Sequence, residues 1–588
     1  MAANSTSPSP ALQWIEEVTR NADVEQQNAL AQILAQNADT EYLKGFNVDG
    51  GMDKETFKSK VPMVTYEDIQ PLIRRMADGD SSPILCAQPI SEFYWSSGTS
   101  GEPKLIPSTK EVLHRNLFLF HLLDDVMDMH VKGLDKGKRL CFVFTKSDKK
   151  TQGGITIRLA SSSLYKSDTY KNRPRNVHTS PNEAIYCEDT FQSMYTQLLC
   201  GLYEREQVNR IETIFAFSLV RVIKFLQLNW QQLTQDIRTG LLNPKVADPS
   251  IRECMSRLMR PDPDLADYIG KECAKDNWEG IVTRIWSNTK YLGTIVTGTM
   301  AQYIPTLDYY SGGLPIASTM YASSECIFGI NLNPMCKPSQ VSYTFMPNEV
   351  YFEFLPTSSS EDLTHSQLVD LLDVEIGKEY EIVVTTTAGL YRYRVGDIVR
   401  ATGFYNSAPQ FQFVMRKNVV LNIDWEMTKE TELQAAVENA SQFLFRQFKT
   451  SLVDYTSFVD TTTNPDHYVI YWELQAKDLA ISPSDDVLDQ CCLVMEESLN
   501  WAYRRLRVSD NLIGPLEIRV VKNGTFEELM DCAISKGASM SQYKAPRCVG
   551  SKKPMLDLLE SRVVSKHFSP SLPHLSSDDG SEKNLIQE

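Results

Sequence analysis

Length is the strongest constraint on how this chain folds. At 588 residues it is more than twice the roughly 250 residues at which one hydrophobic core stops growing, so at least two domains are expected. Hydrophobic residues make up 42% and charged residues 23%, which is typical of globular proteins and excludes wholesale disorder. No repeat is visible at periods of about 20 to 50 residues, which disfavours a solenoid or propeller.

Charge and cysteine usage narrow the function classes. The formal net charge of -16 disfavours nucleic acid as a partner, so any nucleotide must bind in a local pocket. The first residues lack a basic n-region, and no segment approaches ~20 apolar residues, so neither secretion nor membrane insertion is expected. Twelve cysteines without C-x-x-C pairs give little support for disulfides or a zinc site. We expect a cytoplasmic monomer whose ligands are small molecules.

Two sequence patterns predict one long helix and a group of strands. Apolar residues recur at spacings of 4, 3, 4, 3 and 4 residues, which predicts one buried face of a long helix; they are Leu219, Ile223, Leu226, Trp230, Leu233 and Ile237. The segments EYEIVVTTTAGLYRYRVGDIV and FQFVMRKNVVLNID are rich in β-branched and aromatic residues, which predicts strands on either side of the turn GFYNSAPQ.

After Asp424 the composition changes from β-branched and aromatic residues to alanine and charged residues, which predicts a domain boundary. The following stretch, WEMTKETELQAAVENA, is predicted to be helical. Strands (HYVIYWEL, GPLEIRVV) then alternate with helices (QCCLVMEESLNWAYRRL, TFEELMDCAISKG), which predicts a small α+β domain. We therefore expect a large domain at 1–424, a small domain at 425–570 and a disordered tail at 571–588. Within QCCLVMEESLNWAYRRL, Cys491 and Cys492 are expected to be buried as small apolar groups.

The segment FYWSSGTSGEPKLIP, residues 93–107, has a composition that suits phosphate. Hydroxyl groups, two glycines that let backbone N–H groups approach an anion, and one cation lie close together. These residues are Ser96, Ser97, Gly98, Thr99, Ser100, Gly101 and Lys104. The spacing is not that of a P-loop, and composition alone fits an ordinary surface loop equally well.

Two acidic residues are further candidates. In TMYASSECIFGINLNP, residues 319–334, Glu325 is a candidate Mg²⁺ ligand, because magnesium prefers one or two carboxylates with phosphate and water. In LYRYRVGDIV, Asp397 is a candidate for binding both hydroxyls of a ribose. Each has a plain alternative: a hydrogen-bonded loop glutamate, and a turn aspartate paired with Arg394 or Arg400.

Together, and in this order, the three segments resemble the plant acyl-acid amido synthetases of the Gretchen Hagen family, which belong to the adenylate-forming enzymes. The resemblance extends over almost the whole chain, including VTGTMAQYIPTLDYYSGGLP, CKPSQVSYTFMPN and QYKAPRCV. It implies a mixed α/β fold, with a large N-terminal domain of β-barrel, β-sheets and helices and a smaller, mobile α+β C-terminal domain.

The resemblance also implies a reaction. A carboxylate attacks the α-phosphorus of Mg-ATP, giving an acyl-adenylate and pyrophosphate, and the amine of an amino acid then displaces AMP. Ser96, Ser97 and Thr99 should contact phosphates, Tyr321, Ala322 and Ser323 the nucleotide, Glu325 the Mg²⁺ and Asp397 the ribose. Lys544, in SQYKAPRC, resembles the C-terminal lysine that moves into the site, where a cation would offset developing charge.

For the acid, Arg115 resembles the basic residue that binds the substrate carboxylate in the auxin-conjugating branch, and a guanidinium suits that role. Leu164, Phe217 and Met320 are expected to form apolar walls. Leu123 stands where benzoate-using members have arginine, and YASSEC departs from the jasmonate branch. Indole-3-acetic acid is therefore the expected substrate.

The chain also departs from the family pattern. Met427 replaces a lysine near the ATP phosphates, and Lys429 would lie on the same face if a strand continued. Tyr94, Trp95 and Ile327 also differ from the usual residues, which would reshape the acid pocket. Three alternatives stay open: the same chemistry on benzoate-type acids or jasmonate, transfer to coenzyme A, and a catalytically weak acid-binding member of the family.

Overall fold

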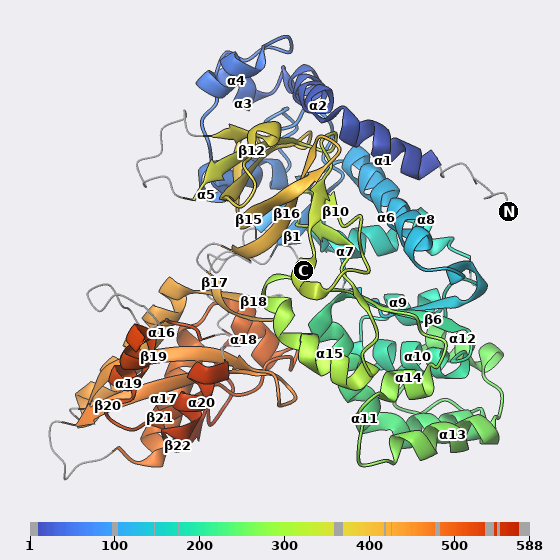
Figure 1. Cartoon of the computed structure of the whole chain (residues 1–588), viewed down its shortest axis with the longest axis vertical. Coiled ribbons are helices and arrows are strands. Elements are labelled where there is room, and N and C mark those ends of the chain that lie inside the picture. Colours follow the sequence, from blue (N-terminus) through green and yellow to red (C-terminus); the bar gives the residue numbers. More distant parts are fainter. Residues whose placement is uncertain are drawn as a thin grey trace. The chain divides into compact units, whose positions relative to one another are not determined.

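The computed structural model describes residues 10–96, 104–145, 147–174, 176–357, 368–416, 419–424, 426–448, 450–476, 483–535, 546–549 and 553–575 (Figure 1). They divide into two compact units, one of residues 10–96 and 104–416 and the other of residues 419–575. Both units combine sheets with helices, which confirms the mixed α/β class.

An eight-stranded antiparallel sheet in the first unit carries most of the predicted site residues. Its described strands are hydrogen-bonded in the order β13-β12-β14-β15-β16-β11-β10-β9. They are β9 (Met320–Ala322), β10 (Ile327–Ile330), β11 (Tyr343–Phe345), β12 (Tyr351–Pro356), β13 (Val369–Asp370), β14 (Glu379–Thr385), β15 (Tyr393–Tyr405) and β16 (Ala408–Arg416). Phe345, Phe354 and Phe411 pack at its centre, with ring centroids of Phe345 and Phe411 4.5 Å apart.

The hairpin of β15 and β16 confirms that strands lie on either side of the predicted turn, but the second predicted segment is divided between β16 and β17 (Val419–Ile423), which belong to different sheets. Asn406 has φ 53°, a left-handed conformation that asparagine tolerates and that two-residue hairpin turns require. Register shifts interrupt the pairing at Ile398/Val399 and Ala401/Gly403. They set the register that places Asp397 directly across from Arg416.

Two smaller sheets complete the first unit. The strands β1 (Glu92–Ser96), β2 (Lys104–Ser108), β4 (Lys149–Lys150) and β5 (Thr156–Arg158) form one, and the parallel strands β3 (Lys138–Cys141), β6 (Val208–Phe215), β7 (Leu292–Ile295) and β8 (Ile316–Ala317) form the other. The helices are α1 (Pro10–Arg20), α2 (Ala22–Asn37), α3 (Glu41–Gly45), α4 (Lys54–Lys60), α5 (Tyr66–Ala77), α6 (Lys110–His130), α7 (Ala160–Lys166), α8 (Asp168–Lys171), α9 (Asn182–Tyr186), α10 (Thr190–Tyr203), α11 (Ala216–Thr239), α12 (Pro249–Leu258), α13 (Pro263–Cys273), α14 (Ile281–Ile285) and α15 (Ile304–Ser311).

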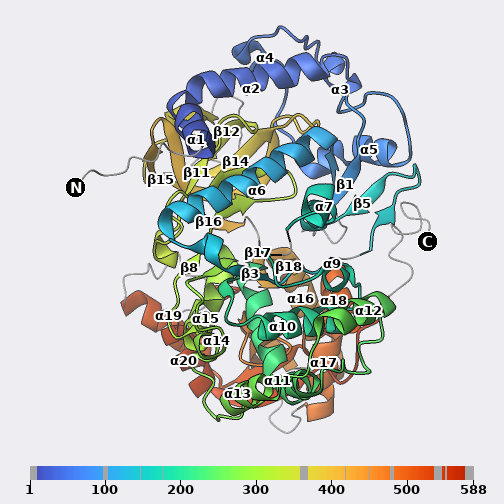
Figure 2. The ribbon, with the colours of Figure 1, turned by 90° about the vertical axis from the view of Figure 1, so that its right-hand side faces the viewer.

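The long helix α11 confirms the predicted apolar stripe. Five of the six stripe residues are at most 4% exposed, and Trp230 packs against the same core. The helix ends at Gly240, whose φ of 68° is the left-handed conformation common just after a helix. Figure 2 shows α6, another long helix of this unit, extending alongside α1.

The second unit is a four-stranded sheet, in the order β19-β20-β21-β22, with helices and a separate hairpin. Its elements are β17 (Val419–Ile423), β18 (Glu426–Lys429), α16 (Glu430–Phe448), β19 (Thr450–Asp460), β20 (His467–Ala476), α17 (Asp485–Ser498), α18 (Trp501–Val508), β21 (Glu517–Val521), α19 (Thr525–Ser535), α20 (Lys553–Ser561) and β22 (Val563–Phe568). Cys491 and Cys492 are fully buried against this sheet, as expected.

Two local predictions in this unit are wrong. Residues 426–429 form β18 rather than the first turn of a helix, because they pair with β17 and bury Glu426 and Thr428. The predicted helix at 490–506 is two helices. Asn500 separates them, since its side chain accepts a hydrogen bond from Tyr503 N at 2.9 Å and caps α18.

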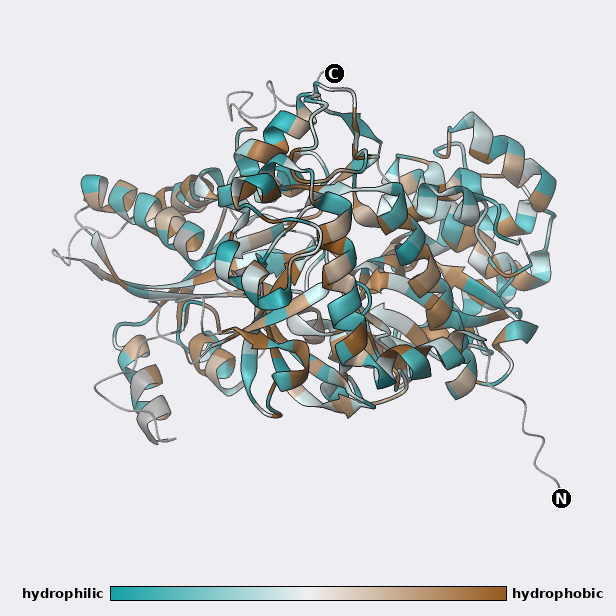
Figure 3. Ribbon diagram, turned by 90° about the horizontal axis from the view of Figure 1, so that it is seen from above, coloured by the Kyte–Doolittle hydropathy of each residue, from teal (hydrophilic) through white to brown (hydrophobic). Residues whose placement is uncertain are grey.

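Hydropathy follows the layering of each unit. Hydrophilic and hydrophobic residues interleave along the helices in Figure 3, as expected for helices with one face on a core. Among the described residues, no helix is both long enough and apolar enough to cross a membrane.

Candidate active site

Asp397 occupies a buried position on β15 near the open end of the hairpin β15–β16, opposite Arg416, the last residue of β16. Asp397 is 4% exposed. The Tyr321 hydroxyl donates to Asp397 Oδ2 at 2.7 Å, and Arg416 Nη1 donates to Asp397 Oδ1 at 3.1 Å. The alternative pairing with Arg394 or Arg400 is wrong, because those side chains bind Glu381 and Glu379 instead.

The pKa of Asp397 is raised, because burial outweighs the opposing effects of Arg416 and Tyr321. Burial, and after it the neighbouring Asp397 carboxylate, raise the pKa of Tyr321. A carboxylate has about four lone-pair positions, and two are occupied by these partners. The remaining two match the two hydroxyl groups of a ribose.

Glu325 lies between β9 and β10, close to Asp397. The turn is held by a hydrogen bond from Ser323 N to Cys326 O at 2.9 Å and by one from Glu325 N to Ser323 Oγ at 3.3 Å. Tyr393, at the start of β15, donates to Glu325 Oε1 at 3.4 Å. Burial lowers the pKa of Arg416, but Asp397 and then Glu325 outweigh it and raise that pKa, so both carboxylates interact with one positive charge.

The donor set suits Mg²⁺. Glu325 is 7% exposed, and its carboxylate accepts only the long hydrogen bond from Tyr393 among the contacts of the described residues. A nearly buried acceptor with unused lone pairs is a ligand that magnesium takes together with phosphate oxygens. Asp397 fits less well, since Tyr321 and Arg416 already engage both of its oxygens.

The described ends of the predicted phosphate segment are residues 93–96 and 104–107. Ser96 is the last residue of β1 and pairs with Lys104 of β2; Ser97 and Thr99 lie outside the described residues. Lys104 Nζ lies 5.0 Å from the centroid of the Tyr66 ring. Tyr66 is close enough to Tyr393 to raise its pKa, after burial and Glu325. Lys104 and Glu325 are thus connected through two tyrosines.

Two of the predicted apolar wall residues meet at α6. Leu164, on α7, is buried and packs against a cluster that includes Leu117 and Phe120. Met320, on β9, packs against a second cluster that also contacts Phe120. Phe217 is the second residue of α11.

Arg115 lies elsewhere. Leu117 and Phe120 come two and five residues after it, which at 3.6 residues per turn places them on the opposite side of α6. The Arg115 guanidinium binds Glu111 Oε1 at 3.0 Å, Asn348 O at 3.3 Å and Gln32 Oε1 at 3.4 Å. That it binds the acid's carboxylate therefore remains a prediction, and the geometry gives it no support.

The residues expected to reshape the acid pocket are divided between core and surface. Tyr94 is 2% exposed in the main core, and Ile327 is 5% exposed in the cluster beneath α6. Trp95 is half-buried, with Lys149 Nζ 4.6 Å from its ring centroid. Two of the three departures thus repack cores.

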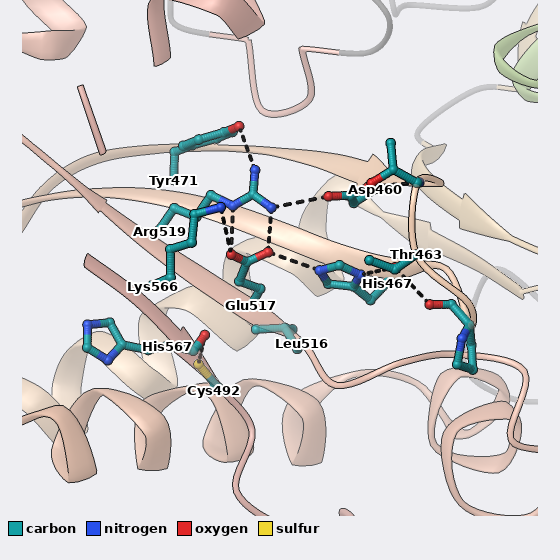
Figure 4. A network of polar contacts seen from close by, with 12 residues as sticks. Asp460, Thr463, His467, Tyr471, Cys492, Leu516, Glu517, Arg519, Lys566 and His567 are labelled. Carbon is teal, nitrogen blue, oxygen red and sulfur yellow. Dashed lines mark hydrogen bonds and ion pairs between the residues drawn. The ribbon is translucent and has the colours of Figure 1, made fainter. Parts of the chain in front are cut away.

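A second buried polar cluster lies in the second unit (Figure 4). His467 Nε2 and Glu517 Oε2 are 3.0 Å apart, and Arg519 Nη2 bridges Glu517 Oε2 at 2.6 Å and Asp460 Oδ2 at 3.1 Å. Burial opposes ionisation of Glu517, but His467 and Arg519 outweigh it and lower its pKa to about 2. The guanidinium already occupies the place of a cation, so the cluster is structural.

Comparison with protein families decides the relationship. The GH3 family N-terminal domain matches residues 11–316, the GH3 family central domain residues 343–416 and the GH3 family C-terminal domain residues 431–553. The chain belongs to the GH3 family. This confirms the resemblance that the three sequence segments indicated.

Individual GH3 proteins match along nearly their whole length. The "Probable indole-3-acetic acid-amido synthetase GH3.1" of Arabidopsis thaliana is 62% identical, over 96% of this chain and 95% of the relative. The "Indole-3-acetic acid-amido synthetase GH3.8" of Oryza sativa subsp. indica is 58% identical, over 96% and 94%. The solved structure of "GH3.15 acyl acid amido synthetase" is 47% identical with a TM-score of 0.68, covering 96% of this chain and 98% of that one.

Two further positions come from the GH3 resemblance. Lys544 lies outside the described residues. Met427 lies in β18, which continues through Lys429, so both side chains project from the same half-exposed face. The strand thus continues through Lys429, as substitution for the missing lysine requires.

Sequence reasoning missed three residues of the candidate site, which are Arg416, Tyr393 and Tyr66. The basic and aromatic alternation of β15 and β16 was visible, but only the register shows that Arg416 faces Asp397. Tyr393 was assigned to a strand without a role, and nothing local in the sequence connects Tyr66 to the later strands.

Proposed function

We propose that this GH3 chain is an ATP-dependent amido synthetase that joins an amino acid to a small carboxylic acid, with indole-3-acetic acid as the acid. The observation that carries the proposal is the group formed by the buried Tyr321, Glu325 and Asp397 with the half-buried Arg416, on a chain whose relatives bear that activity in their names. An acidic pair beside a serine-rich segment suits Mg-ATP.

The proposed reaction has two halves. An oxygen of the acid's carboxylate bonds to the α-phosphorus of ATP, and pyrophosphate leaves with the electron pair of the broken P–O bond. The amine of the amino acid then bonds to the acyl carbon, AMP leaves, and the amine gives up a proton. Activation is needed because a free carboxylate has a poor leaving group, whereas an adenylate has a good one.

Each described residue has a role in this scheme. Asp397 would accept hydrogen bonds from the ribose hydroxyls, and Tyr321 and Arg416 hold it in place. Glu325 would bind the Mg²⁺ that bridges phosphate oxygens and offsets their charge. Tyr321, Ala322 and Ser323 would line the nucleotide, and Ser96 with Ser97 and Thr99 would contact its phosphates. Leu164, Phe217 and Met320 would contact the acid.

The remaining assignments are part of the same proposal. Lys544 would supply a cation to the phosphates from the small C-terminal domain at 425–570. A cytoplasmic monomer, with 571–588 as a tail, fits the composition. Relatives named for indole-3-acetic acid support that substrate, whereas a GH3.15 structure "in complex with 2,4-DB" keeps another aryl acid as the second candidate.

A product assay tests the proposal against its rivals. Purified protein with ATP and Mg²⁺ is given indole-3-acetate, benzoate or jasmonate, followed by aspartate, glutamate or coenzyme A. We expect the mass of an indole-acetyl amino acid. A thioester instead would identify a coenzyme A ligase, and an amide of another acid would keep the chemistry and change the substrate. No product from folded protein would support a weakly active acid-binding member with Met427 as the cause.

A further inference from the structure

Arg392, immediately before β15, has a backbone conformation that arginine rarely adopts. Its φ of 46° lies in the left-handed region, where a large side chain is crowded by its own backbone. Among the described residues, the other non-glycine positions with positive φ are asparagine or aspartate, which tolerate this conformation. Such a backbone costs free energy and persists only where the surrounding structure imposes it. The contacts of Arg392 must therefore outweigh that cost.

The Arg392 side chain is fully buried and makes two kinds of contact. Its Nε and Nη2 donate to the two carboxylate oxygens of Glu353, on β12, at 2.9 and 3.0 Å. Its Nη1 donates to Lys58 O at 2.6 Å and to Val61 O at 2.7 Å. One guanidinium thus joins the eight-stranded sheet to the end of α4 and the residue that follows it.

The segment held by Arg392 then pairs with the backbone on both sides of Tyr393. Val64 N donates to Arg392 O at 3.1 Å, and Arg394 N donates to Val64 O at 2.8 Å. Tyr393 lies between these two bonds, so its backbone cannot shift without breaking one of them. Its hydroxyl donates to Glu325 Oε1 at 3.4 Å, a long hydrogen bond that a small movement of β15 would break.

The same segment continues into α5, whose first residue is Tyr66. The Tyr66 hydroxyl accepts a hydrogen bond from Leu105 N, on β2, at 2.9 Å. Lys104 Nζ, on the same strand, lies 5.0 Å from the centroid of the Tyr66 ring. Residues 58–66 therefore connect Arg392 to the strand that ends the predicted phosphate segment.

Attachment of α4 to the sheet does not by itself require Arg392. Lys54 Nζ binds Asp370 Oδ2 at 2.8 Å, and Lys58 binds the other carboxylate oxygen of Asp370. These ion pairs connect the same helix to β13, and they need no strained backbone. What Arg392 adds is a direct connection between the end of α4 and Tyr393.

We propose that Arg392 is a positioning residue that holds the Tyr393 hydroxyl against Glu325. Through residues 58–66 it also holds Tyr66 beside β2. The inference rests on the proposed function, in which Glu325 binds Mg²⁺ next to the phosphates of ATP. The Arg392 guanidinium is buried against a carboxylate and two carbonyl groups, so it acts through Tyr393 and not on the nucleotide itself.

Hydrogen–deuterium exchange of the full chain, without ATP or acid, tests the inference in Arg392→Lys. Lysine keeps a positive charge beside Glu353 but lacks the planar fork that reaches the carboxylate and both carbonyls. We expect the amides of the turn at 323–326 to exchange about tenfold faster than in the parent, because fewer contacts then oppose its local opening. Faster exchange at 58–64 with an unchanged turn overturns the proposal, since Arg392 would then only hold the segment that it touches.

Glu353→Gln is a second, milder variant, which decides the question if Arg392→Lys does not fold. Glutamine is nearly isosteric with glutamate and keeps one acceptor for the guanidinium. The turn at 323–326 should again exchange faster than in the parent, by a smaller factor than in Arg392→Lys. An unchanged turn in Glu353→Gln contradicts the proposal.

Pyrophosphate exchange gives a second readout. In Arg392→Lys the Mg²⁺ concentration for half-maximal exchange should rise about tenfold, a usual effect of losing a group that orients a metal ligand. The KM for indole-3-acetate should stay as in the parent. A merely structural role would lower the amount of active enzyme, and with it the maximal rate, without changing the Mg²⁺ requirement. Tyr393→Phe, which removes only the hydroxyl, should raise that requirement as well.

Arg394→Lys is the matched control. Arg394 also lies on β15 and binds a buried glutamate through two hydrogen bonds, from Nε to Glu381 Oε1 at 3.0 Å and from Nη2 to Glu381 Oε2 at 2.7 Å, but its backbone is not left-handed. We expect it to leave both the turn and the Mg²⁺ requirement unchanged. An equal rise in Arg394→Lys and Arg392→Lys overturns the assignment to Arg392. A parent without any pyrophosphate exchange contradicts the proposed function alone, and the hydrogen exchange of the turn then decides for or against Arg392.

Discussion

The state of Asp397 is set by competing contacts of single residues. Burial raises the pKa of its carboxyl, and Arg416 and the Tyr321 hydroxyl offset only part of that shift. Arg416 in turn depends on Asp397 and Glu325 for its countercharge. A ribose that binds here meets an acceptor already fixed by two donors, so little side-chain entropy is lost on binding.

Substitution of Asp397 by Asn should therefore have two effects. The KM for ATP should rise about 10- to 100-fold, because charge-assisted hydrogen bonds to two hydroxyls are replaced by weaker ones. Stability should fall by about 3 kcal/mol, because Arg416 loses its buried partner. Pyrophosphate-exchange kinetics and urea unfolding measure them. Tyr321→Phe is the control, since it keeps the charge, and an unchanged KM in Asp397→Asn would remove Asp397 from the nucleotide site.

At the scale of elements, β18 has one buried face and one half-exposed face. Glu426 and Thr428 point inward, and the carboxylate of Glu426 accepts hydrogen bonds from Thr428 Oγ1 at 2.6 Å, Asn500 Nδ2 at 3.0 Å and the Tyr468 hydroxyl. Met427 and Lys429 are half-exposed on the other face. Residues 426–429 form a strand where a helix was predicted. This strand fixes both the buried Glu426 and Met427, which stands in the place of the missing lysine.

The buried Glu426 predicts that the stability of the protein depends on pH. Burial raises the pKa of Glu426 from 4.5 to about 7, so the folded form holds a proton that the unfolded form releases between these values. Stability should fall as pH rises from 4.5 through 7 and then level off. Glu426→Gln mimics the protonated side chain and should be more stable than the parent by up to about 3 kcal/mol above pH 8, with little difference near pH 4.5. Chemical unfolding at both pH values measures this; equal slopes in the two proteins would exclude Glu426.

The exposed face predicts a gain of activity. Met427→Lys restores a cation beside Lys429, and each well-placed cation near phosphates lowers an adenylation barrier by a few kcal/mol at most. We expect acid-dependent pyrophosphate exchange to rise about tenfold. Lys429→Ala should lower exchange in the parent but much less in Met427→Lys. If Lys429→Ala has no effect while Lys544→Ala abolishes exchange, Lys429 does not substitute for the lysine.

At the scale of the whole molecule, each unit has its own apolar core, and the predictions from sequence succeeded where the determining contacts are local. The stripe on α11 and the Asn406 turn are examples, because helix periodicity and left-handed backbone are properties of a short segment. Predictions failed where a partner is distant. Residues 426–429 are a strand only because β17 pairs with them, and Arg416 reaches Asp397 only through two register shifts.

The same reasoning explains the candidate site. Glu325 and Asp397 were identifiable because of the family resemblance, whereas their mutual proximity depends on the order of strands in the eight-stranded sheet. Arg115 has the right chemistry for a carboxylate. Its face of α6 could not be assigned from the residue type, and the structure places it toward α2 and the turn at Asn348.

Acid-dependent exchange of pyrophosphate into ATP, measured with indole-3-acetate and Mg²⁺ in the absence of any amino acid, tests the central claim most directly. It isolates the first half of the reaction, in which the Asp397 and Glu325 cluster binds the nucleotide and its metal. The account predicts exchange that requires the acid and is lost in Glu325→Ala. Exchange that does not depend on any acid, or full exchange in folded Glu325→Ala, would contradict it.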